Sequence, residues 1–380
     1  MKKVFAINLG STSTKVAYSE DGNVIYKETI TYHKEDFVGC ATFFDQQEIR
    51  TRGIKDNMAA HGVKLDELDA IVSRGGMMQP MPVGVFEINE AMVNQEKACT
   101  YGLHPSSMGC VIALELANEG GCHAFTADVP SSDELLPIAR YTGLPERWRR
   151  TMTQTLNARA VVREWAAARG KRYEDVNAIT TGLGGGINTI AHCHGRMIDT
   201  NNSVDGEGCF STNRCLTVPI DILIDDCYSG KWTYDEMRQR VSRRAGLLGY
   251  LGTADAVEIE KRVDAGDEYA REVVEAMCYQ IAKDIGAFAT TLKGDVDVIF
   301  LAGGMARFKL VTDLITERVS FIAPVEIHPG ELEMEALCEN AYRALIGDLP
   351  VQEFVAAESP REAMDWIDEI WEDSDWTYAR

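Results

Sequence analysis

Two glycine-rich segments of the sequence contain the residue types that bind phosphate. The first is GSTSTK at residues 10–15, where a glycine is followed by hydroxyl side chains and a lysine. It lacks the second glycine of the P-loop motif GxxxxGK[ST]. The second is GLGGG at residues 182–186. Backbone N–H groups of a tight turn can hold an anion, especially beside hydroxyl and ammonium donors. Both segments therefore predict phosphate binding by a loop that is not a Walker loop.

The residues around the first loop predict strands on both sides of it. Between residues 4 and 30, apolar side chains alternate with small or polar ones, and Asp21-Gly22 gives a turn signal. The loop thus joins strand to strand, whereas a Walker or Rossmann loop joins a strand to a helix and uses the helix N-terminus. The phosphate donors here are expected to be turn amides and the hydroxyls of residues 11–14.

The same pattern occurs twice along the chain. Residues 176–198 repeat the order strand, glycine loop, strand, turn glycine and strand. Residues 68–77 and 296–305 each predict a buried strand that ends in Gly-Gly, in the same order within each half. We therefore expect a duplicated α/β unit with a cleft between the copies. Helical periodicity predicts the intervening helices, at residues 106–119, 157–169, 267–292 and 335–346.

Composition limits the classes of partner. With 380 residues, 45% of them apolar, the chain is long enough for two domains. The net charge is 38 − 59 = −21, which disfavours nucleic acid and anionic membranes as partners. No apolar run has the length of a signal peptide core or a membrane span. Ten cysteines without a CxxC pair indicate reduced thiols. We expect a cytoplasmic protein.

Two further segments each allow two interpretations. His192, Cys193 and His194 either form part of a metal site or lie at the tip of a hairpin.

Residues 351–380 carry nine acidic side chains against two arginines, a charge of −7, with tryptophans at positions 366, 371 and 376. This extension is either a helix that lies on the surface through its Trp and Ile side, or a tail that binds a partner or a second copy. In either case, we expect its deletion to spare catalysis.

A duplicated fold whose hairpin loops bind phosphate is typical of the superfamily of acetate and sugar kinases, Hsp70 and actin. Within it, residues 1–347 resemble the butyrate kinases, a branch of the acetate kinase group. The motifs that carry the resemblance are NLGSTSTK at 8–15, SRGG at 73–76, INEAMVN at 88–94, YGLHPSSMG at 101–109, GLGGGI at 182–187, DTNNSVDGEGCFS at 199–211, GYLGTADAVEIEKR at 249–262, FLAGGM at 300–305 and ERVSFIAPVEIHPGELEMEAL at 317–337.

The resemblance implies an α/β fold of two duplicated actin-like (ribonuclease H-like) domains with an interdomain cleft. It implies domains at 1–155 and 156–347, followed by an extension at 348–380. The implied reaction transfers the γ-phosphoryl group of ATP, with Mg²⁺, to a short-chain carboxylate and gives an acyl phosphate, or runs in reverse. A homodimer or larger homo-oligomer is also implied. The methionine-rich residues 77–86 are candidates for the acyl pocket.

The resemblance also implies roles for individual residues. Arg74 and Arg214, one from each half, would neutralise the transferring phosphoryl group, since such catalysis depends on positioning and electrostatics. Asp128 would hold Mg²⁺ or orient the acceptor, and His104 would donate to a phosphoryl oxygen. Candidates for nucleotide and phosphate binding are Asn8, Gly10, Ser11, Ser13, Lys15, Gly184, Gly185, Gly186, Asp205, Gly303 and Gly304. Candidates for the metal are Asn8 and Glu333, with Glu331 as second choice.

The sequence departs from the family pattern near the expected site. Leu9 replaces a proline, and Gln154 and Gly182 stand where histidines are common. Cys215-Leu216 replaces Ser-Gly after the second arginine. The favoured hypothesis is an active carboxylate kinase of the butyrate type. The alternative is a nucleotide-binding paralogue with weak or no kinase activity that acts through protein partners. A sugar kinase is disfavoured because the resemblance continues through the DGEG and PGELEME segments.

Overall fold

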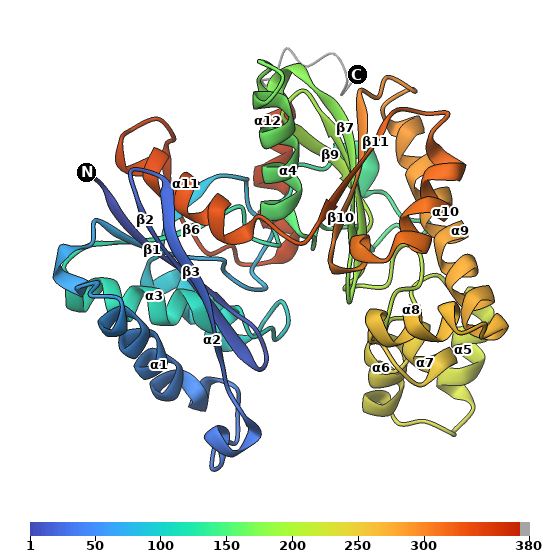
Figure 1. Ribbon diagram of the computed structural model, residues 1–380, viewed down its shortest axis with the longest axis horizontal. Coiled ribbons are helices and arrows are strands. Elements are labelled where there is room, and N and C mark those ends of the chain that lie inside the picture. The colour runs from blue at the N-terminus through green and yellow to red at the C-terminus, as the bar shows by residue number, and fades with distance from the viewer. Residues whose placement is uncertain (373–380) are drawn as a thin grey trace. The chain divides into compact units, whose positions relative to one another are not determined.

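The computed structural model describes residues 1–372, which form two compact units. The first unit comprises residues 1–133, 155–160 and 332–372, and the second comprises residues 134–154 and 161–331. Each unit is built on one β-sheet with helices packed against it (Figure 1). Within the described residues, no helix is both long and apolar enough to cross a membrane.

The first unit contains a seven-stranded sheet with the strand order β12-β5-β6-β4-β1-β2-β3. Its strands are β1 (Lys3–Leu9), β2 (Ser13–Glu20), β3 (Asn23–Thr31), β4 (Ala70–Ser73), β5 (Val85–Glu87), β6 (His123–Ala127) and β12 (Val351–Glu353). Strands β1, β2 and β3 form an antiparallel meander, while β4 pairs parallel with β1 and β6 pairs parallel with β4. The glycine loop at residues 10–12 therefore connects two strands, as predicted.

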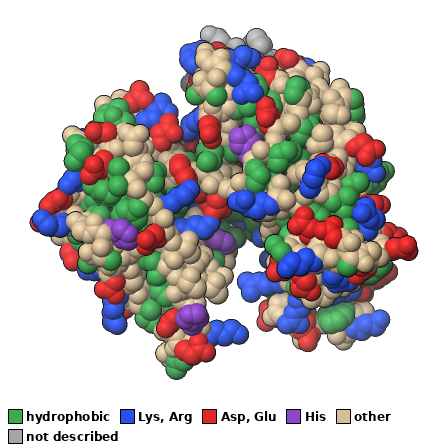
Figure 2. Space-filling view, in the orientation of Figure 1, with side chains coloured by type: hydrophobic (Ala, Val, Ile, Leu, Met, Phe, Trp, Pro, Cys, Tyr) green, Lys and Arg blue, Asp and Glu red, His purple; other side chains and the backbone are tan. Residues whose placement is uncertain are grey.

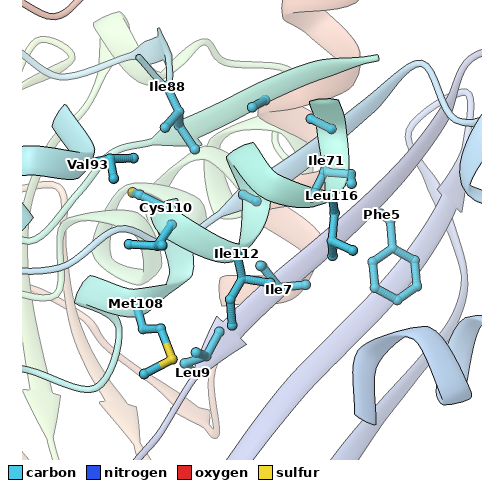
Figure 3. Packing of buried hydrophobic residues seen from close by; sticks show 14 of the residues in the cluster. Phe5, Ile7, Leu9, Ile71, Ile88, Val93, Met108, Cys110, Ile112 and Leu116 are labelled. Carbon is cyan, nitrogen blue, oxygen red and sulfur yellow. The ribbon is translucent and has the colours of Figure 1, made fainter. Parts of the chain in front are cut away.

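Alternating side chains of β1 fill both faces of this sheet. Phe5, Ile7 and Leu9 pack with Met108, Ile112 and Leu116 in one cluster, as Figure 3 shows. Val4 and Ala6 belong to a second cluster on the other side, together with Leu337 and Ala341. This is the period of two expected for a strand buried on both faces. The unit's helices are α1 (Gln47–Ala60), α2 (Glu90–Ala98), α3 (Ser107–Gly120), α11 (Glu333–Leu345) and α12 (Pro360–Glu372), with the first residues of α4 (Thr155–Ala167).

The second unit contains a five-stranded sheet with the order β11-β10-β7-β8-β9. Its strands are β7 (Asn177–Leu183), β8 (Ile187–Cys193), β9 (Arg196–Thr200), β10 (Val298–Gly303) and β11 (Val325–Pro329). Its helices are the rest of α4, α5 (Ile220–Tyr228), α6 (Tyr234–Arg243), α7 (Gly246–Leu251), α8 (Ala256–Asp264), α9 (Glu268–Thr291) and α10 (Lys309–Val319). Short 3₁₀ helices occur at Lys34–Phe37, Phe44–Gln46, Leu65–Glu67, Pro137–Arg140, Tyr173–Asp175 and Gly304–Arg307.

The two sheets repeat one topology. The series β3-β2-β1-β4-β6 in the first unit corresponds to β9-β8-β7-β10-β11 in the second. In both, an antiparallel meander is followed by two parallel strands. The repeated strand pattern seen in the sequence is therefore confirmed. All four predicted helices are also present, with ends within about two residues of the predicted ones.

The division into units differs from the domain boundaries expected from the sequence. Those boundaries placed residues 332–347 in the second domain, but helix α11 packs on β1, β2 and β4 of the first sheet (Figure 1). The physical reason is the apolar face of α11, where Met334, Leu337 and Ala341 are buried in the cluster around Val4. A segment distant in sequence thus completes the core of the first unit.

The C-terminal segment is likewise part of the first unit. Strand β12 pairs parallel with β5, and the buried side chain of Phe354 joins the core cluster of α3. Helix α12 follows, with Ile367 and Trp371 buried and Trp366 39% exposed. The predicted helix is present and buries part of its Trp and Ile side, but the sequence analysis missed the strand. Trp376 lies outside the described residues.

Candidate functional site

The predicted site residues form two sets, one in each unit, and each set is described by itself. Acidic and basic side chains are interspersed on the visible surface of each unit, despite the net charge of −21 (Figure 2). Polar side chains gather where glycine loops follow the central strands. These loops follow β1 and β4 in the first unit and β7 and β10 in the second.

The loop after β1 is a tight turn between antiparallel strands. The Gly10 amide donates to the Ser13 carbonyl at 2.8 Å. Ser11 and Thr12 form its exposed tip. Asn8 at the end of β1 pairs in register with Lys15 on β2. Five of the predicted phosphate-binding residues thus lie within one hairpin, as expected from their sequence order.

A buried carboxylate connects this hairpin with the end of β4. The side-chain amide of Asn8 donates to Glu333 Oε2 at 2.7 Å, and Arg74 Nε donates to Glu333 Oε1 at 3.1 Å. Glu333 is the first residue of α11, where the helix dipole favours a negative charge. Arg74 directly follows β4, and its own amide donates to the Ile7 carbonyl of β1. The structure therefore brings together three predicted residues that are up to 325 positions apart.

The side-chain oxygen atoms of this cluster are of the type that Mg²⁺ prefers as ligands. Glu333 supplies a carboxylate and Asn8 an amide oxygen. Because Arg74 and the Asn8 amide group already donate to Glu333, the cluster suits an ion that keeps several of its water ligands, as Mg²⁺ usually does. Glu331, the second choice from the sequence, is an exposed residue at the end of the second unit.

Asp128 is buried and held by three neighbours within the first unit. It directly follows β6 with a left-handed backbone (φ 45°), which is uncommon for a residue with a side chain. Its Oδ1 accepts from the Gly84 amide at 3.0 Å. Its Oδ2 lies 3.3 Å from Arg159 Nε and 3.4 Å from the Asn340 side-chain nitrogen. The sequence analysis missed both Arg159 and Asn340, which fix the orientation of this carboxylate.

His104 lies just before helix α3 and contacts Ser106. The Ser106 amide donates to its Nδ1 at 3.2 Å, and the Ser106 hydroxyl lies 2.7 Å from the same nitrogen. Both contacts of Ser106 are with Nδ1, so they orient the imidazole ring at the start of α3.

Glu96, a residue that the sequence analysis missed, supports the loop after β4. It is fully buried on α2, and its Oε1 accepts from the Gly76 amide at 2.8 Å. Burial raises the pKa of Glu96 to about 7, partly offset by hydrogen bonds from Ser107 and the Gly76 amide. A Cβ on Gly76 would lie 2.2 Å from the Ser107 hydroxyl, so only glycine lets this loop approach α3.

In the second unit, the loop after β7 is covered by an arginine. A Cβ on Gly186 would lie 2.6 Å from the Ser203 hydroxyl and 2.7 Å from Arg214 Nη1. Arg214 Nη1 donates to the carbonyl and the hydroxyl of Ser203, both at 3.0 Å. Burial lowers the pKa of the Arg214 guanidinium. A side chain at 186 would therefore displace Arg214, a predicted catalytic arginine, or Ser203. The Ser211 hydroxyl also donates to the Gly185 carbonyl at 2.6 Å.

Gln154 and Gly182, which both depart from the family pattern, are neighbours in space. A Cβ on Gly182 would lie 2.4 Å from Gln154 Oε1. The Gln154 carboxamide therefore occupies the space beside β7 that a side chain at 182 would take. One side-chain amide therefore remains beside the glycine loop.

The third departure from the family pattern is Cys215-Leu216, where Leu216 replaces a glycine but has a backbone conformation typical of glycine. Leu216 has φ 47°, in the left-handed region that favours glycine. Its side chain is nevertheless buried, and the neighbouring Cys215 amide donates to the Val241 carbonyl at 2.9 Å. This turn after Arg214 therefore exists although the family's glycine is replaced.

Three other predicted residues have different surroundings. Gly303 (φ 104°) lies against β7 so closely that a Cβ at this position would be 2.5 Å from the Leu183 carbonyl. Packing within the second unit therefore explains why residue 303 is a glycine. A Cβ on Gly304 would meet nothing within 4 Å, so that position is open. Asp205 is exposed, and its Oδ2 accepts from Arg150 Nε and the Asn202 side-chain amide, both at 2.9 Å.

The histidines of the 192–194 segment do not form a metal site together. His192 is fully buried, with its ring nitrogens 2.7 Å from the Tyr173 hydroxyl and 2.9 Å from the Thr180 hydroxyl. His194 lies in the exposed turn between β8 and β9. In the part of the chain that the structure describes, no group of three or more His, Cys, Asp or Glu side chains could hold a metal ion.

Known proteins resemble this chain over most of its length. Residues 149–333 match the model of the Acetokinase family. The chain is 42% identical over 351 residues to a probable butyrate kinase of Bacteroides thetaiotaomicron, covering 92% of this chain and 99% of that protein.

Solved structures of such enzymes have the same fold. The acetate kinase of Porphyromonas gingivalis aligns with a TM-score of 0.75 at 17% identity, covering 91% of this chain and 100% of that one. A propionate kinase of Francisella tularensis subsp. tularensis SCHU S4 aligns with a TM-score of 0.73 at 16% identity, covering 90% and 99%. At these identities the likeness concerns the fold, which is the expected pair of actin-like units. This chain belongs to the acetokinase family of carboxylate kinases.

Proposed function

We propose that the protein transfers the γ-phosphoryl group of ATP to butyrate, or to a related short or branched acid, and also catalyses the reverse reaction. The observation that carries the proposal is the buried cluster in which Asn8 and Arg74 both donate to Glu333. It joins the glycine hairpin, the Gly-Gly strand end and the carboxylate of the PGELEME segment. The 42% identity to a probable butyrate kinase supports a four-carbon acid.

The residues of each unit would supply different parts of the reaction. In the first unit, Lys15 and the amides of residues 10–13 would bind a phosphate, and Arg74 would neutralise charge that develops on the phosphoryl oxygens. His104 would donate to such an oxygen. Asp128, held by Arg159, would orient the acceptor. Bound Mg²⁺, held through water by Asn8 and Glu333, would neutralise phosphate charge.

The second unit would bind the nucleotide. Gly184, Gly185 and Gly186 would let the β-phosphate approach the backbone closely. Arg214 would stabilise the transferring group, and the Gln154 amide would provide a further donor in place of histidine. Gly304, with open space above it, would lie under the adenosine. Asp205 stays a candidate for nucleotide binding through its loop.

A hydroxamate assay for acyl phosphate tests the proposal. Purified protein with ATP and Mg²⁺ is offered acetate, propionate, butyrate, isobutyrate, valerate and isovalerate, and ATP binding is measured by calorimetry. We expect turnover on four- or five-carbon acids, and a loss of about 10³-fold in kcat for Arg214→Ala with ATP still bound. ATP binding without hydroxamate from any acid would favour the non-catalytic paralogue instead, an alternative that the comparisons do not favour.

We also propose a cytoplasmic homodimer. All ten cysteines are free, consistent with a reducing compartment. Helix α5 of the second unit exposes apolar side chains at helical spacing on one face, Ile220, Leu223, Ile224 and Tyr228, and a further one, Ile222, on another side. Such a face is typical of a surface that a partner covers.

A further inference from the structure

A buried arginine lies behind the glycine hairpin of the first unit. Arg50, in the first half of α1, is fully buried. Its Nη2 donates to the Ser11 carbonyl at 2.9 Å, and its Nη1 donates to the Ser13 carbonyl at 3.2 Å and to Thr14 Oγ1 at 3.3 Å. The guanidinium thus binds the main chain on both sides of the exposed tip of the hairpin.

This positive charge has no acidic partner in its unit. Among residues 1–372, none of the salt bridges involves Arg50, and its remaining hydrogen bonds go to Gln46 Oε1. Three aromatic rings, those of Tyr32, Phe37 and Phe43, lie 5.0 to 5.1 Å from the guanidinium carbon. Buried charges are normally paired because desolvation is expensive. An arginine in this position therefore needs a negative charge from elsewhere.

The hairpin presents its amides on the opposite side. In a planar trans peptide the N–H points away from the carbonyl of the same unit. Because Arg50 holds the Ser11 carbonyl, the Thr12 N–H points away from the guanidinium. The Thr12 carbonyl accepts from the Tyr32 amide at 2.9 Å, so the next N–H, that of Ser13, points away from Tyr32. Within the described chain, no acceptor is recorded for the Ser11 and Thr12 amides, which lie at the exposed tip.

We propose that Arg50 is a positioning residue for phosphoryl binding. It holds the carbonyls of residues 11 and 13 so that the outward amides bind a phosphoryl dianion, which in turn supplies the counter-charge that Arg50 lacks. Its charge also polarises these peptide units and strengthens their N–H groups as donors. The inference rests on the proposed function, since it takes residues 10–15 as the phosphate site. The dianion belongs either to the nucleotide or to the acyl phosphate.

Two substitutions separate the charge of Arg50 from its geometry. Arg50→Met removes both, and Arg50→Lys keeps a point charge without the planar fork of donors. Two variants in the same helix are matched controls. Arg52→Met removes an exposed arginine, and Ile54→Val perturbs the core without touching the hairpin.

The experiment measures thermal shifts, kinetics and exchange on the full chain. MgATP and orthophosphate are the two ligands used as probes of binding. Hydrogen exchange reports the protection of the amides of residues 9–16. Hydroxamate formation gives kcat and KM. For Arg50→Met we expect a kcat about 10²-fold lower, loss of the ligand-induced thermal shift and loss of exchange protection at residues 11–14. Arg50→Lys should keep KM for MgATP within about threefold while kcat falls at least tenfold. Both controls should behave as wild type.

The outcomes distinguish this inference from the proposed function. A loss of the shift with only one of the two probes supports the role of Arg50 and identifies which phosphoryl source the hairpin binds. If wild-type protein makes acyl phosphate and Arg50→Met keeps its kcat and both thermal shifts, the role of Arg50 is overturned and the proposed function stands. If wild-type protein neither responds to MgATP nor makes hydroxamate, the proposed function itself fails.

Discussion

At the residue scale, the departures from the family pattern are coupled. Gln154 and Gly182 are separate positions in the sequence, but the carboxamide of one fills the space beside the other. The chain therefore has a different polar group near the glycine loop rather than two independent losses. Residues in such contact are expected to show non-additive effects of mutation.

A double-mutant cycle tests this coupling. Gly182→Ala would place a Cβ 2.4 Å from Gln154 Oε1, at the end of a flexible side chain. We expect a stability change below about 1 kcal/mol, because the glutamine can move, but a drop in kcat of about tenfold or more since the amide is displaced. Gln154→Ala should lower kcat similarly, and the double variant should be no worse than Gln154→Ala alone. Additive losses would show that the two residues act independently.

The raised pKa of Glu96 is expected to make the free energy of unfolding of the protein depend on pH. Its pKa is about 7 in the folded protein against an ordinary value of 4.5, so the folded state holds an additional proton between these pH values. Stability should therefore fall as pH rises from about 4.5 to 7, by roughly 3 kcal/mol. Glu96→Gln keeps an acceptor for the Gly76 amide and should remove this loss, so that the variant is more stable than wild type at pH 8.

Urea unfolding at pH 5 and pH 8 measures this difference. Glu90→Gln, at the exposed start of the same helix, is the matched control and should follow the wild-type profile. If Glu96→Gln and wild type lose the same stability between the two pH values, Glu96 does not hold the proton.

At the element scale, the C-terminal strand is the main correction to the sequence-based account. Strand β12 extends the first sheet beside β5, and Gln352 Nε2 donates to the Val83 carbonyl at 2.9 Å. The side-chain amides of Asn89 and Gln79 donate to the carbonyls of Phe354 and Val355, both at 2.9 Å. These contacts indicate that residues 351–355 stabilise the first unit, while the expectation that deletion of residues 351–380 spares catalysis stays a prediction.

Phe354 tests the contribution of this strand. Its side chain is 3% exposed within the core cluster, so Phe354→Ala should destabilise the protein by about 3 to 5 kcal/mol. Val355→Ala, at an exposed neighbouring position, should change stability by less than about 0.5 kcal/mol. Denaturant unfolding distinguishes the two, and equal, small effects would mean that β12 contributes little.

At the scale of the whole molecule, the exposed face of α5 predicts self-association. Light scattering after size exclusion should give 2 × 42.1 = 84.2 kDa for wild-type protein. Ile220→Asp, together with Ile224→Asp on the same helix face, should give 42.1 kDa, because a charged group within an apolar contact is poorly solvated. An unchanged mass in the double variant would place the contact on another surface, and a 42.1 kDa wild-type mass would exclude the homodimer.

The sequence by itself determined the elements and the positions of the loops. Alternation in residues 4–30 and 176–198 and the repeated Gly-Gly strand ends are local patterns, so they revealed the duplicated topology before any contact was known. Asn8, Arg74 and Glu333 were identified because the segments that contain them resemble motifs of the family.

Only the tertiary structure decided which distant residues meet. Arg50 and Arg159 lie on ordinary amphipathic helices, and nothing near them in sequence shows that one reaches the hairpin carbonyls and the other Asp128. Glu96 had a weak signal, since it shares the buried face of α2 with Met92 and Val93. The assignment of α11 and β12 to the first unit also required the folded chain. Burial and hydrogen-bond partners depend on packing between segments that are tens to hundreds of residues apart, which a local pattern does not encode.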